Sequence, residues 1–249
     1  MGSLHSCRGR RQEQASHRMW TWALLPVLLA VGGIVGSWAV YAISVSNNTV
    51  NVTAKFPFIS ECAIYQPESA LFCLFCIVWT LLIIWVVVIR YQQIRELGNL
   101  CRRANLAALV LGFIAASGVS ILGSFSLKVS LGVHLFGAYL AFFVGLAYFW
   151  VQLWLTYKAE PSQDRRCVGP WRASLCSLCT LFLMGMFVLK PAGFRSLAAI
   201  SEWAMVMVFF ILFGSFAVEF RHVHHFQVTV QKQDGAMANG DGTNRNLMI

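Results

Sequence analysis

The sequence predicts an all-α protein, a polytopic membrane helical bundle with six transmembrane helices and both termini in the cytoplasm. Two observations carry this prediction: six long apolar stretches, and the alternating Lys/Arg content of the segments between them. Composition agrees, because only 12% of the residues are charged, against about 25% in soluble domains. Little chain is left outside the spans to form a separate catalytic domain.

Each apolar stretch reaches or nearly reaches the length that crosses a bilayer. About 20 mostly apolar residues of helix span the hydrocarbon core, and a helix satisfies its own backbone hydrogen bonds in lipid. The expected spans are residues 20–45, 69–89, 105–127, 132–157, 173–189 and 198–220. Residues 1–19 then form a basic N-terminal tail, and residues 221–249 form a C-terminal tail whose composition is typical of disordered segments.

Lys and Arg are unevenly distributed among the connecting segments. The N-terminal tail, the second loop and the fourth loop hold four each and the C-terminal tail holds three, whereas the first, third and fifth loops hold one, one and two. The positive-inside rule therefore places both termini in the cytoplasm. The net charge of +9 is then a topology signal that also favours anionic inner-leaflet lipids, and we expect no nucleic-acid partner.

Two glycosylation sequons test this orientation independently. Asn47-Asn48-Thr49 and Asn51-Val52-Thr53 match the N-x-[ST] pattern, and both fall in the first loop, on the expected outer side. Short patterns of this kind also occur by chance. Asn51 is the better expected acceptor, because Asn47 lies closer to the end of the first span.

Eight cysteines are expected to form no disulfide framework and no metal site. Cys73 and Cys76, like Cys176 and Cys179, have metal-like spacing, but each pair lies within an apolar span. Zinc requires thiolates in a closed polar shell, so we expect no metal and no cofactor. Cys62 in the first loop and Cys73 near the start of the next span are within reach of a disulfide, and free thiols are the alternative.

Small residues recur at spacings of four within several spans. Small residues at this spacing let helix backbones approach closely, and van der Waals packing then drives association in lipid. We expect this packing to hold one compact bundle together, in preference to a homodimer. The residues concerned are Gly32 and Gly36 in the first span, Ala108, Gly112, Ala116, Ser120 and Ser124 in the third, and Gly137, Ala141 and Gly145 in the fourth.

Polar residues inside the spans are few and lie away from the bilayer centre. His134 and Glu202 begin the fourth and sixth spans, Gln152 lies in the inner half of the fourth, and Glu219 ends the sixth. Transporters place charged or discontinuous elements near the midplane, which these positions do not match. We expect a structural contact between His134 and Glu202, with a proton relay as the alternative.

Enzyme motifs are lacking in the sequence. It contains no G-x-S-x-G, no H-E-x-x-H and no glycine-rich phosphate loop. We therefore expect a protein that is not an enzyme.

Several motifs occur in the same order as in a known membrane family. They are residues 56–60 (FPFIS), 66–69 (QPES), 90–92 (RYQ), 134–152 (HLFGAYLAFFVGLAYFWVQ), 202–203 (EW) and 213–220 (FGSFAVEF). Together they resemble the damage-regulated autophagy modulator family, also called the Frag/DRAM/Sfk family, from about Met19 to Phe220. One departure is Ser124 and Ser126, which stand where the family commonly has Asn and Gln.

The resemblance implies that the protein promotes macroautophagy at plasma, endosomal, lysosomal and autophagosomal membranes. As a mechanism, we expect a scaffold whose basic loops bind cytosolic proteins or phosphoinositides. A plasma-membrane anchor for a phosphoinositide kinase complex is one alternative, and an ion channel or channel subunit is another. The C-terminal Leu247-Met248-Ile249 also fits a PDZ ligand. The candidate basic contacts are Arg90, Arg95, Arg102, Arg103, Arg165 and Arg166.

Overall fold

A computed structural model describes residues 2–98, 101–159 and 164–221, with side chains for 22–98, 101–159 and 166–221. All regular structure in these ranges is helical, and six segments are long and apolar enough to cross a membrane. The predicted six-span, all-α fold is confirmed. The spans are Trp22–Ser46, Glu68–Glu96, Arg102–Ser124, Leu131–Ala159, Arg166–Leu189 and Arg195–Phe220.

Two of the six spans consist of more than one helical element. In the fourth span, α4 (Leu131–Tyr139) and α5 (Gly145–Ala159) are joined by a π-helical segment, Leu140–Val144. In the sixth, α7 (Arg195–Gly214) is followed by the short α8 (Ala217–Phe220). The other helices are α1 (Gly2–Ser46), α2 (Glu68–Glu96), α3 (Arg102–Ser124) and α6 (Asp164–Leu189), and a 3₁₀ turn, Ile59–Glu61, lies in the first loop.

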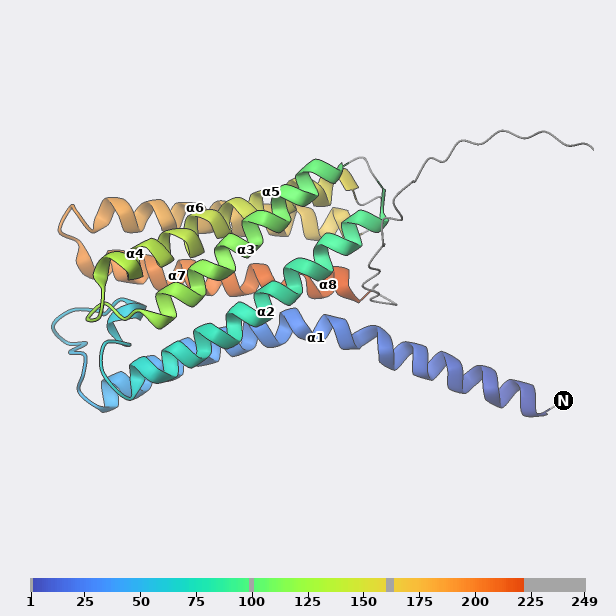
Figure 1. Cartoon of the computed structure of the whole chain (residues 1–249), viewed down its shortest axis with the longest axis horizontal. Coiled ribbons are helices and arrows are strands. Elements are labelled where there is room, and N and C mark those ends of the chain that lie inside the picture. The colour runs from blue at the N-terminus through green and yellow to red at the C-terminus, as the bar shows by residue number, and fades with distance from the viewer. Residues whose placement is uncertain (1, 99–100, 160–163, 222–249) are drawn as a thin grey trace, which may run out of the picture.

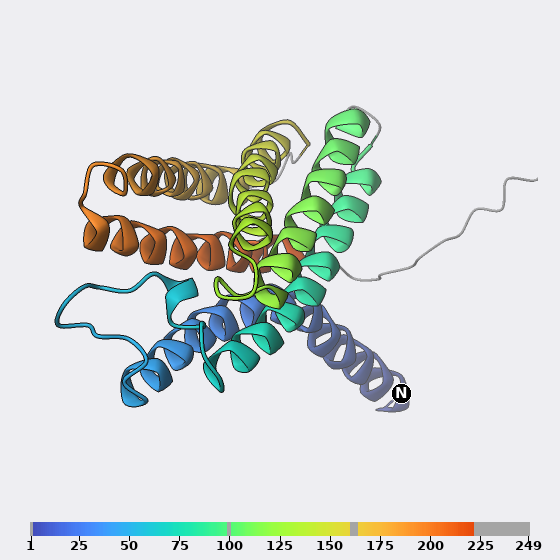
Figure 2. The same ribbon diagram turned by 60° about the vertical axis from the view of Figure 1, so that its left-hand side comes forward.

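The helices form a closed ring in which each span packs against its neighbours in sequence, and α7 and α8 return to α1. Figure 1 shows the three connections at residues 47–67, 125–130 and 190–194 together at one end of the bundle, which we call the loop end. The opposite end, where α2, α5 and α8 finish and α3 and α6 begin, is the terminal end. Figure 2 shows α6 and α7 lying side by side as a hairpin.

Close backbone approaches occur at glycines: at Gly137 of α4, as the small-residue pattern predicts, and at Gly118 of α3, which lies outside the predicted stripe. A Cβ atom on Gly118 of α3 would lie 2.5 Å from the Ala141 nitrogen and 2.7 Å from the Gly137 oxygen. In α1 the pattern is wrong in detail, because Gly32 faces open space whereas Gly33 packs against the ring of Phe210. Gly36 does pack as predicted, since a Cβ there would lie 3.0 Å from the Trp79 ring, so α1 meets the bundle at Gly33 and Gly36.

Two helices extend further toward the terminal end than the hydropathy predicts. The second span continues past residue 89 to Glu96, and α6 begins at Asp164, nine residues before the predicted start. Arg90 and Arg172 therefore lie within helices, although the sequence places them in cytoplasmic loops. A charged residue is tolerated there because it finds an opposite charge inside the bundle.

Candidate functional site

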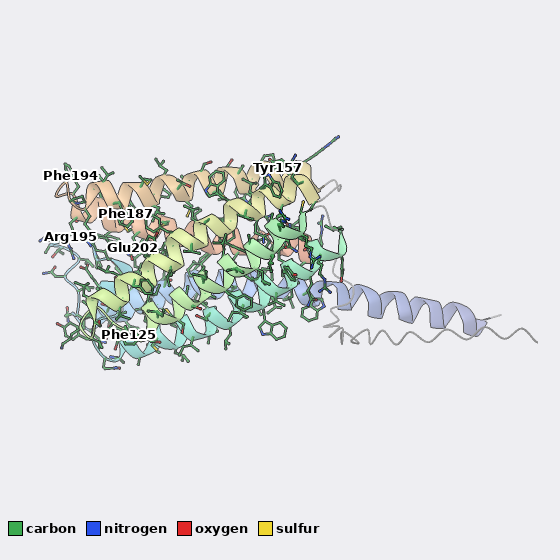
Figure 3. The ribbon with its side chains drawn as sticks, turned by 45° about the horizontal axis from the view of Figure 1, so that its top comes forward. Phe125, Tyr157, Phe187, Phe194, Arg195 and Glu202 are labelled. Atoms are coloured by element: carbon green, nitrogen blue, oxygen red, sulfur yellow. The ribbon has the colours of Figure 1, made fainter. Side chains whose placement is uncertain are left out.

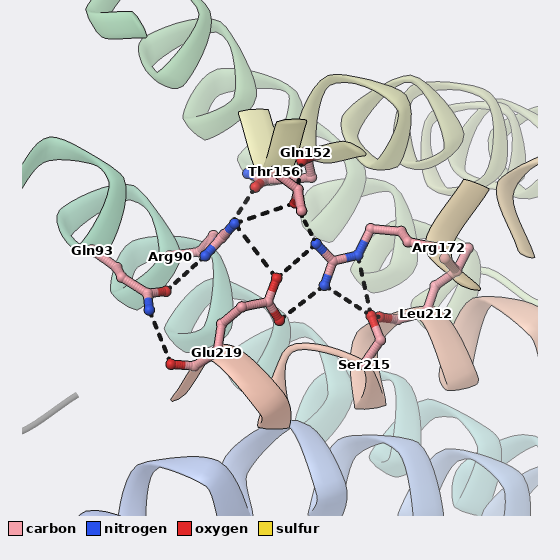
Figure 4. Close-up of polar contacts among 8 residues, drawn as sticks. All are labelled: Arg90, Gln93, Gln152, Thr156, Arg172, Leu212, Ser215 and Glu219. Atoms are coloured by element: carbon pink, nitrogen blue, oxygen red, sulfur yellow. Dashed lines mark hydrogen bonds and ion pairs between the residues drawn. The ribbon is translucent and has the colours of Figure 1, made fainter. Parts of the chain in front are cut away.

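Three charged side chains meet inside the bundle at its terminal end: Arg90 of α2, Arg172 of α6 and Glu219 of α8 (Figure 4). The arginines are 0% exposed and Glu219 is 2% exposed. Arg172 binds the carboxylate in a two-pronged manner, with Nη1 2.8 Å from Oε1 and Nη2 donating to Oε2 at 3.0 Å. Arg90 Nη2 lies 3.5 Å from Oε1. One buried anion thus joins two cations.

Neutral polar groups bind the remaining donors of the two arginines. Arg90 donates to the side-chain oxygens of Gln93 at 2.8 Å and Gln152 at 3.2 Å. Arg172 donates to Thr156 Oγ1 at 2.7 Å and to Ser215 Oγ at 3.0 Å. Buried charges are stable only when they are paired and hydrogen-bonded, and this network meets both conditions. We call these seven residues the terminal-end network: Arg90, Gln93, Gln152, Thr156, Arg172, Ser215 and Glu219.

The break between α7 and α8 positions the acidic member of the network. Ser215 follows the end of α7 at Gly214, and its hydroxyl donates to the Leu212 carbonyl at 2.6 Å. Such back-bonding often bends a helix, and the chain resumes as α8 with Glu219 facing inward. The Phe216 ring lies 4.6 Å from Arg172 Cζ and 5.7 Å from Arg90 Cζ. At these distances, cation–π attraction to the Phe216 ring stabilises both arginines.

The network joins four spans and is suited to holding them in place. It connects α2, α5, α6 and α8. It therefore holds in place α2, which leads into the second loop, and α5 and α6, which flank the fourth loop. Groups of three or more His, Cys, Asp or Glu suited to a metal are not found among the described residues. The network's hydrogen bonds and ion pairs thus fix the positions of these four helices relative to one another at the terminal end.

The predicted basic contacts differ in whether the structure leaves their side chains exposed. Arg90 is buried in the network, so its side chain is not available to a cytoplasmic partner. The side chain of Arg165 lies outside the described residues, as does the predicted PDZ ligand at Leu247–Ile249. Four of the others are exposed at the terminal end, and with the exposed Lys158 we call them the basic surface: Arg95, Arg102, Arg103, Lys158 and Arg166.

His134 and Glu202 both lie near the loop end and line one cavity, but the structure does not place them in contact. His134 Nδ1 is 2.7 Å from the Phe125 carbonyl oxygen, which fixes its ring at the turn between α3 and α4. Glu202 is 7% exposed, and none of the described side chains forms a hydrogen bond with its carboxyl group. The two residues therefore line the same cavity without a hydrogen bond between them.

Of the two alternatives for Cys62 and Cys73, a disulfide or free thiols, the structure shows free thiols. Cys62 is buried beneath the first loop, and its Sγ lies 3.5 Å from the Phe58 carbonyl oxygen, to which it donates. Burial, aided by the nearby negative charge of Glu61, raises the pKa of the Cys62 thiol to about 12. A thiol that stays protonated at neutral pH is a weak nucleophile.

The two sequons of the first loop differ in their surroundings. Asn47 directly follows α1, and its amide donates to the buried Glu68 carboxylate at 2.8 Å. Asn51 is exposed, and its Oδ1 accepts a 2.6 Å bond from Thr53, the hydroxyl residue of its own sequon. Both asparagines are exposed, and they differ in that the amide of Asn47 is bound to the Glu68 carboxylate.

Sequence reasoning missed four members of the network: Gln93, Thr156, Arg172 and Ser215. A signal was present for one of them, since Gln152 and Thr156 are four residues apart and so share one helical face. Nothing in the sequence links this face to Arg90 or Arg172, which come from distant helices.

Comparison with known proteins supports one family across the bundle. The family model described as the Frag1/DRAM/Sfk1/Cwh43P N-terminal domain matches residues 21–223. "Modulator of macroautophagy TMEM150B" of Danio rerio is 56% identical over 223 residues, which are 90% of this chain and 96% of that protein. The Homo sapiens protein of the same name is 40% identical over 215 residues, which are 86% of this chain and 92% of that protein. "Transmembrane protein 150A" of Xenopus laevis is 30% identical, covering 82% and 86%. No solved structure matches.

Proposed function

Because the chain belongs to the Frag1/DRAM/Sfk1/Cwh43P family, we propose that it modulates macroautophagy as a multi-pass membrane regulator without catalytic activity of its own. The observation that carries this proposal is the 56% identity, over nearly the whole bundle, to a relative named a modulator of macroautophagy. The direction we propose is promotion of autophagic flux. The membranes we propose are the plasma membrane and those of endosomes, lysosomes and autophagosomes.

The proposed mechanism is that of a scaffold acting through the basic surface. The exposed Arg102 and Arg103 begin α3, and the exposed Arg166 lies in the first turn of α6. The terminal-end network binds α2, α5, α6 and α8 to one another at the same end of the bundle. Exposed arginines near a membrane attract anionic lipids and acidic proteins. With the terminal end in the cytoplasm, this surface would meet phosphoinositides and cytosolic partners, including a lipid kinase complex.

The test is autophagic flux, measured with and without a lysosomal block in cells that lack or overexpress the chain. The proposal expects flux to rise and fall with expression. Unchanged flux at both extremes would reject it. In that case ion flux through reconstituted bilayers would be measured next, since a channel is the competing function.

Glycosylation gives a test of the proposed orientation. We expect Asn51→Gln to abolish the glycan of the expressed chain, and Asn47→Gln to leave it in place, because Asn47 directly follows α1 and its amide is bound to Glu68. The measurement is the gel mobility of each variant before and after treatment with an N-glycosidase. A wild-type chain that carries no glycan would leave the orientation to the charge pattern alone. A glycan that survives Asn51→Gln would contradict the assignment of the acceptor.

A further inference from the structure

We infer that the bundle holds a lipid alcohol, a hydrocarbon body with an uncharged hydroxyl head, in an intramembrane cavity anchored at Glu202. This inference rests on the cavity and its polar end, and it does not depend on the proposed role in macroautophagy. A sterol and a glycerol- or sphingoid-based lipid with a free hydroxyl share this chemistry.

The cavity has the size and the surroundings of a ligand site. It measures about 770 Å³ and is lined by side chains from all six spans, within the range of about 300–1,000 Å³ for small-molecule pockets. Phe72 and Val87 of α2 both line it. Fifteen residues of helix separate them, which corresponds to about 22 Å. The cavity therefore reaches across much of a hydrocarbon core of about 30 Å.

The cavity opens toward the membrane between α4 and α6. Leu135 and Tyr139 of α4 and Phe187 of α6 line it, and they are 49%, 55% and 51% exposed. The rings of Phe143 and Phe187, which both line the cavity, meet with their centroids 5.2 Å apart. Both α4 and α6 belong to spans long and apolar enough to cross a membrane, so in a bilayer a lipid can enter sideways between them.

The polar end of the cavity lies at the loop end of the bundle. Figure 3 shows Glu202, Arg195 and Phe187 near one end and Tyr157 near the other. The charged groups lining the cavity are Glu61, Lys190, Arg195 and Glu202, two acidic and two basic. Glu61 forms an ion pair with Arg195, and Lys190 Nζ lies 5.3 Å from the centre of the Phe58 ring. Balanced charges of this kind do not favour a strongly anionic or cationic head.

Glu202 is the charged lining group that no described side chain binds, and the Tyr148 hydroxyl, which also lines the cavity, has no hydrogen-bond partner among the described residues. Glu202 is 7% exposed and lines the cavity, yet no described side chain forms a hydrogen bond with it. Buried polar groups are nearly always hydrogen-bonded to protein, water or a ligand, so this carboxyl group is available to a polar group that enters the cavity. A hydroxyl can donate to a carboxylate oxygen, or to the carbonyl oxygen of a protonated carboxyl group. It therefore satisfies Glu202 in either protonation state.

The test uses the full-length chain purified in detergent and light-activated, radiolabelled lipid probes. One arm uses a sterol probe, and the other uses a diacylglycerol probe with a free hydroxyl. We expect one of the two to label the wild-type chain, and the unlabelled alcohol to compete about tenfold better than its methyl ether, which cannot donate a hydrogen bond. The arm that labels identifies the source of the ligand.

Two variants test the site itself. Glu202→Leu removes the polar anchor, and Ala138→Trp fills the cavity from α4, which it lines. Each should lower labelling about tenfold. The matched control Leu181→Trp places the same bulk on a membrane-facing side chain that is 66% exposed, and it should label as the wild type does. A single symmetric peak in size-exclusion chromatography shows that a variant is folded. The competition between the alcohol and its methyl ether uses only the wild-type chain, so it does not depend on the folding of any variant.

Three outcomes would overturn the inference. The first is equal competition by the alcohol and its methyl ether. The second is full labelling of the Ala138→Trp variant. The third is a wild-type chain that takes up neither probe, or that yields only detergent or charged lipids when its bound molecules are extracted and identified by mass spectrometry.

Discussion

Replacing Glu219 with Leu is expected to destabilise the bundle more than replacing either of the arginines that bind it. Glu219 is the one acidic member of the terminal-end network, so its loss leaves Arg90 and Arg172 buried without a counter-charge. Breaking a buried ion pair on one side costs about 3–5 kcal/mol. Arg172→Met should cost less, because it leaves Arg90 and Glu219 as a neutral pair. The measurement is the thermal denaturation of each purified variant in detergent, followed by tryptophan fluorescence.

A triple variant provides the control for this prediction. Arg90→Met, Arg172→Met and Glu219→Leu together remove every charge, and apolar replacement of a buried ionic triad is often neutral or stabilising. Ser215 keeps its bond to the Leu212 carbonyl and Thr156 its bond to the Gln152 carbonyl. Most of the stability lost in Glu219→Leu should therefore return. A triple variant as unstable as Glu219→Leu would show that the charges themselves, and not their imbalance, hold the helices together.

Gly118→Leu is expected to disrupt the packing of α3 against the fourth span. A Cβ at this position would lie 2.5 Å from the Ala141 nitrogen and 2.7 Å from the Gly137 oxygen. Both are backbone atoms, which cannot turn aside as a flexible side chain can. Overpacking a core costs about 1–3 kcal/mol and occasionally more, and we expect this substitution at or above the upper end. Loss of the monodisperse chromatographic peak, or a large fall in the denaturation temperature, would be the readout.

Gly32→Leu is the matched control, because a Cβ at Gly32 meets nothing within 4 Å. The same change of side chain on α1 should leave stability nearly unaltered. Equal effects at Gly32 and Gly118 would contradict the packing described for α3. The comparison also separates the structure from the sequence pattern, which treats Gly32 as an interface residue.

The spans could be predicted from the sequence because hydropathy and length act locally. A run of apolar residues must form a helix in lipid whatever surrounds it, so all six spans were identified. The terminal-end network depends on contacts between distant helices. Arg90 and Arg172 follow or precede their apolar stretches and read as loop charges, until Glu219 is known to lie between them. Charge counting along the chain does not contain that information.

Other features of the structure also depend on contacts between helices or lack a sequence signal. The π-helical segment at Leu140–Val144 has no sequence signature, since its residues are as apolar as those on either side. The facing of Gly33 toward Phe210 depends on the rotation of α1 against α7. Glu202 and His134 stand out in the sequence as polar residues within spans. The sequence does not show that His134 bonds the Phe125 carbonyl oxygen whereas no described side chain bonds Glu202.

The account is tested most directly by restoring autophagic flux in cells that lack the chain, with a lysosomal block to separate formation from degradation. We predict that the wild-type chain restores flux and that a variant with Arg102, Arg103, Arg165 and Arg166 all changed to Gln does not, although it reaches the same membranes in the same amount. Lys55→Gln, a charge change in the exposed first loop, should restore flux fully. Full restoration by the four-arginine variant would contradict the scaffold mechanism, and no restoration by the wild-type chain would contradict a role in macroautophagy.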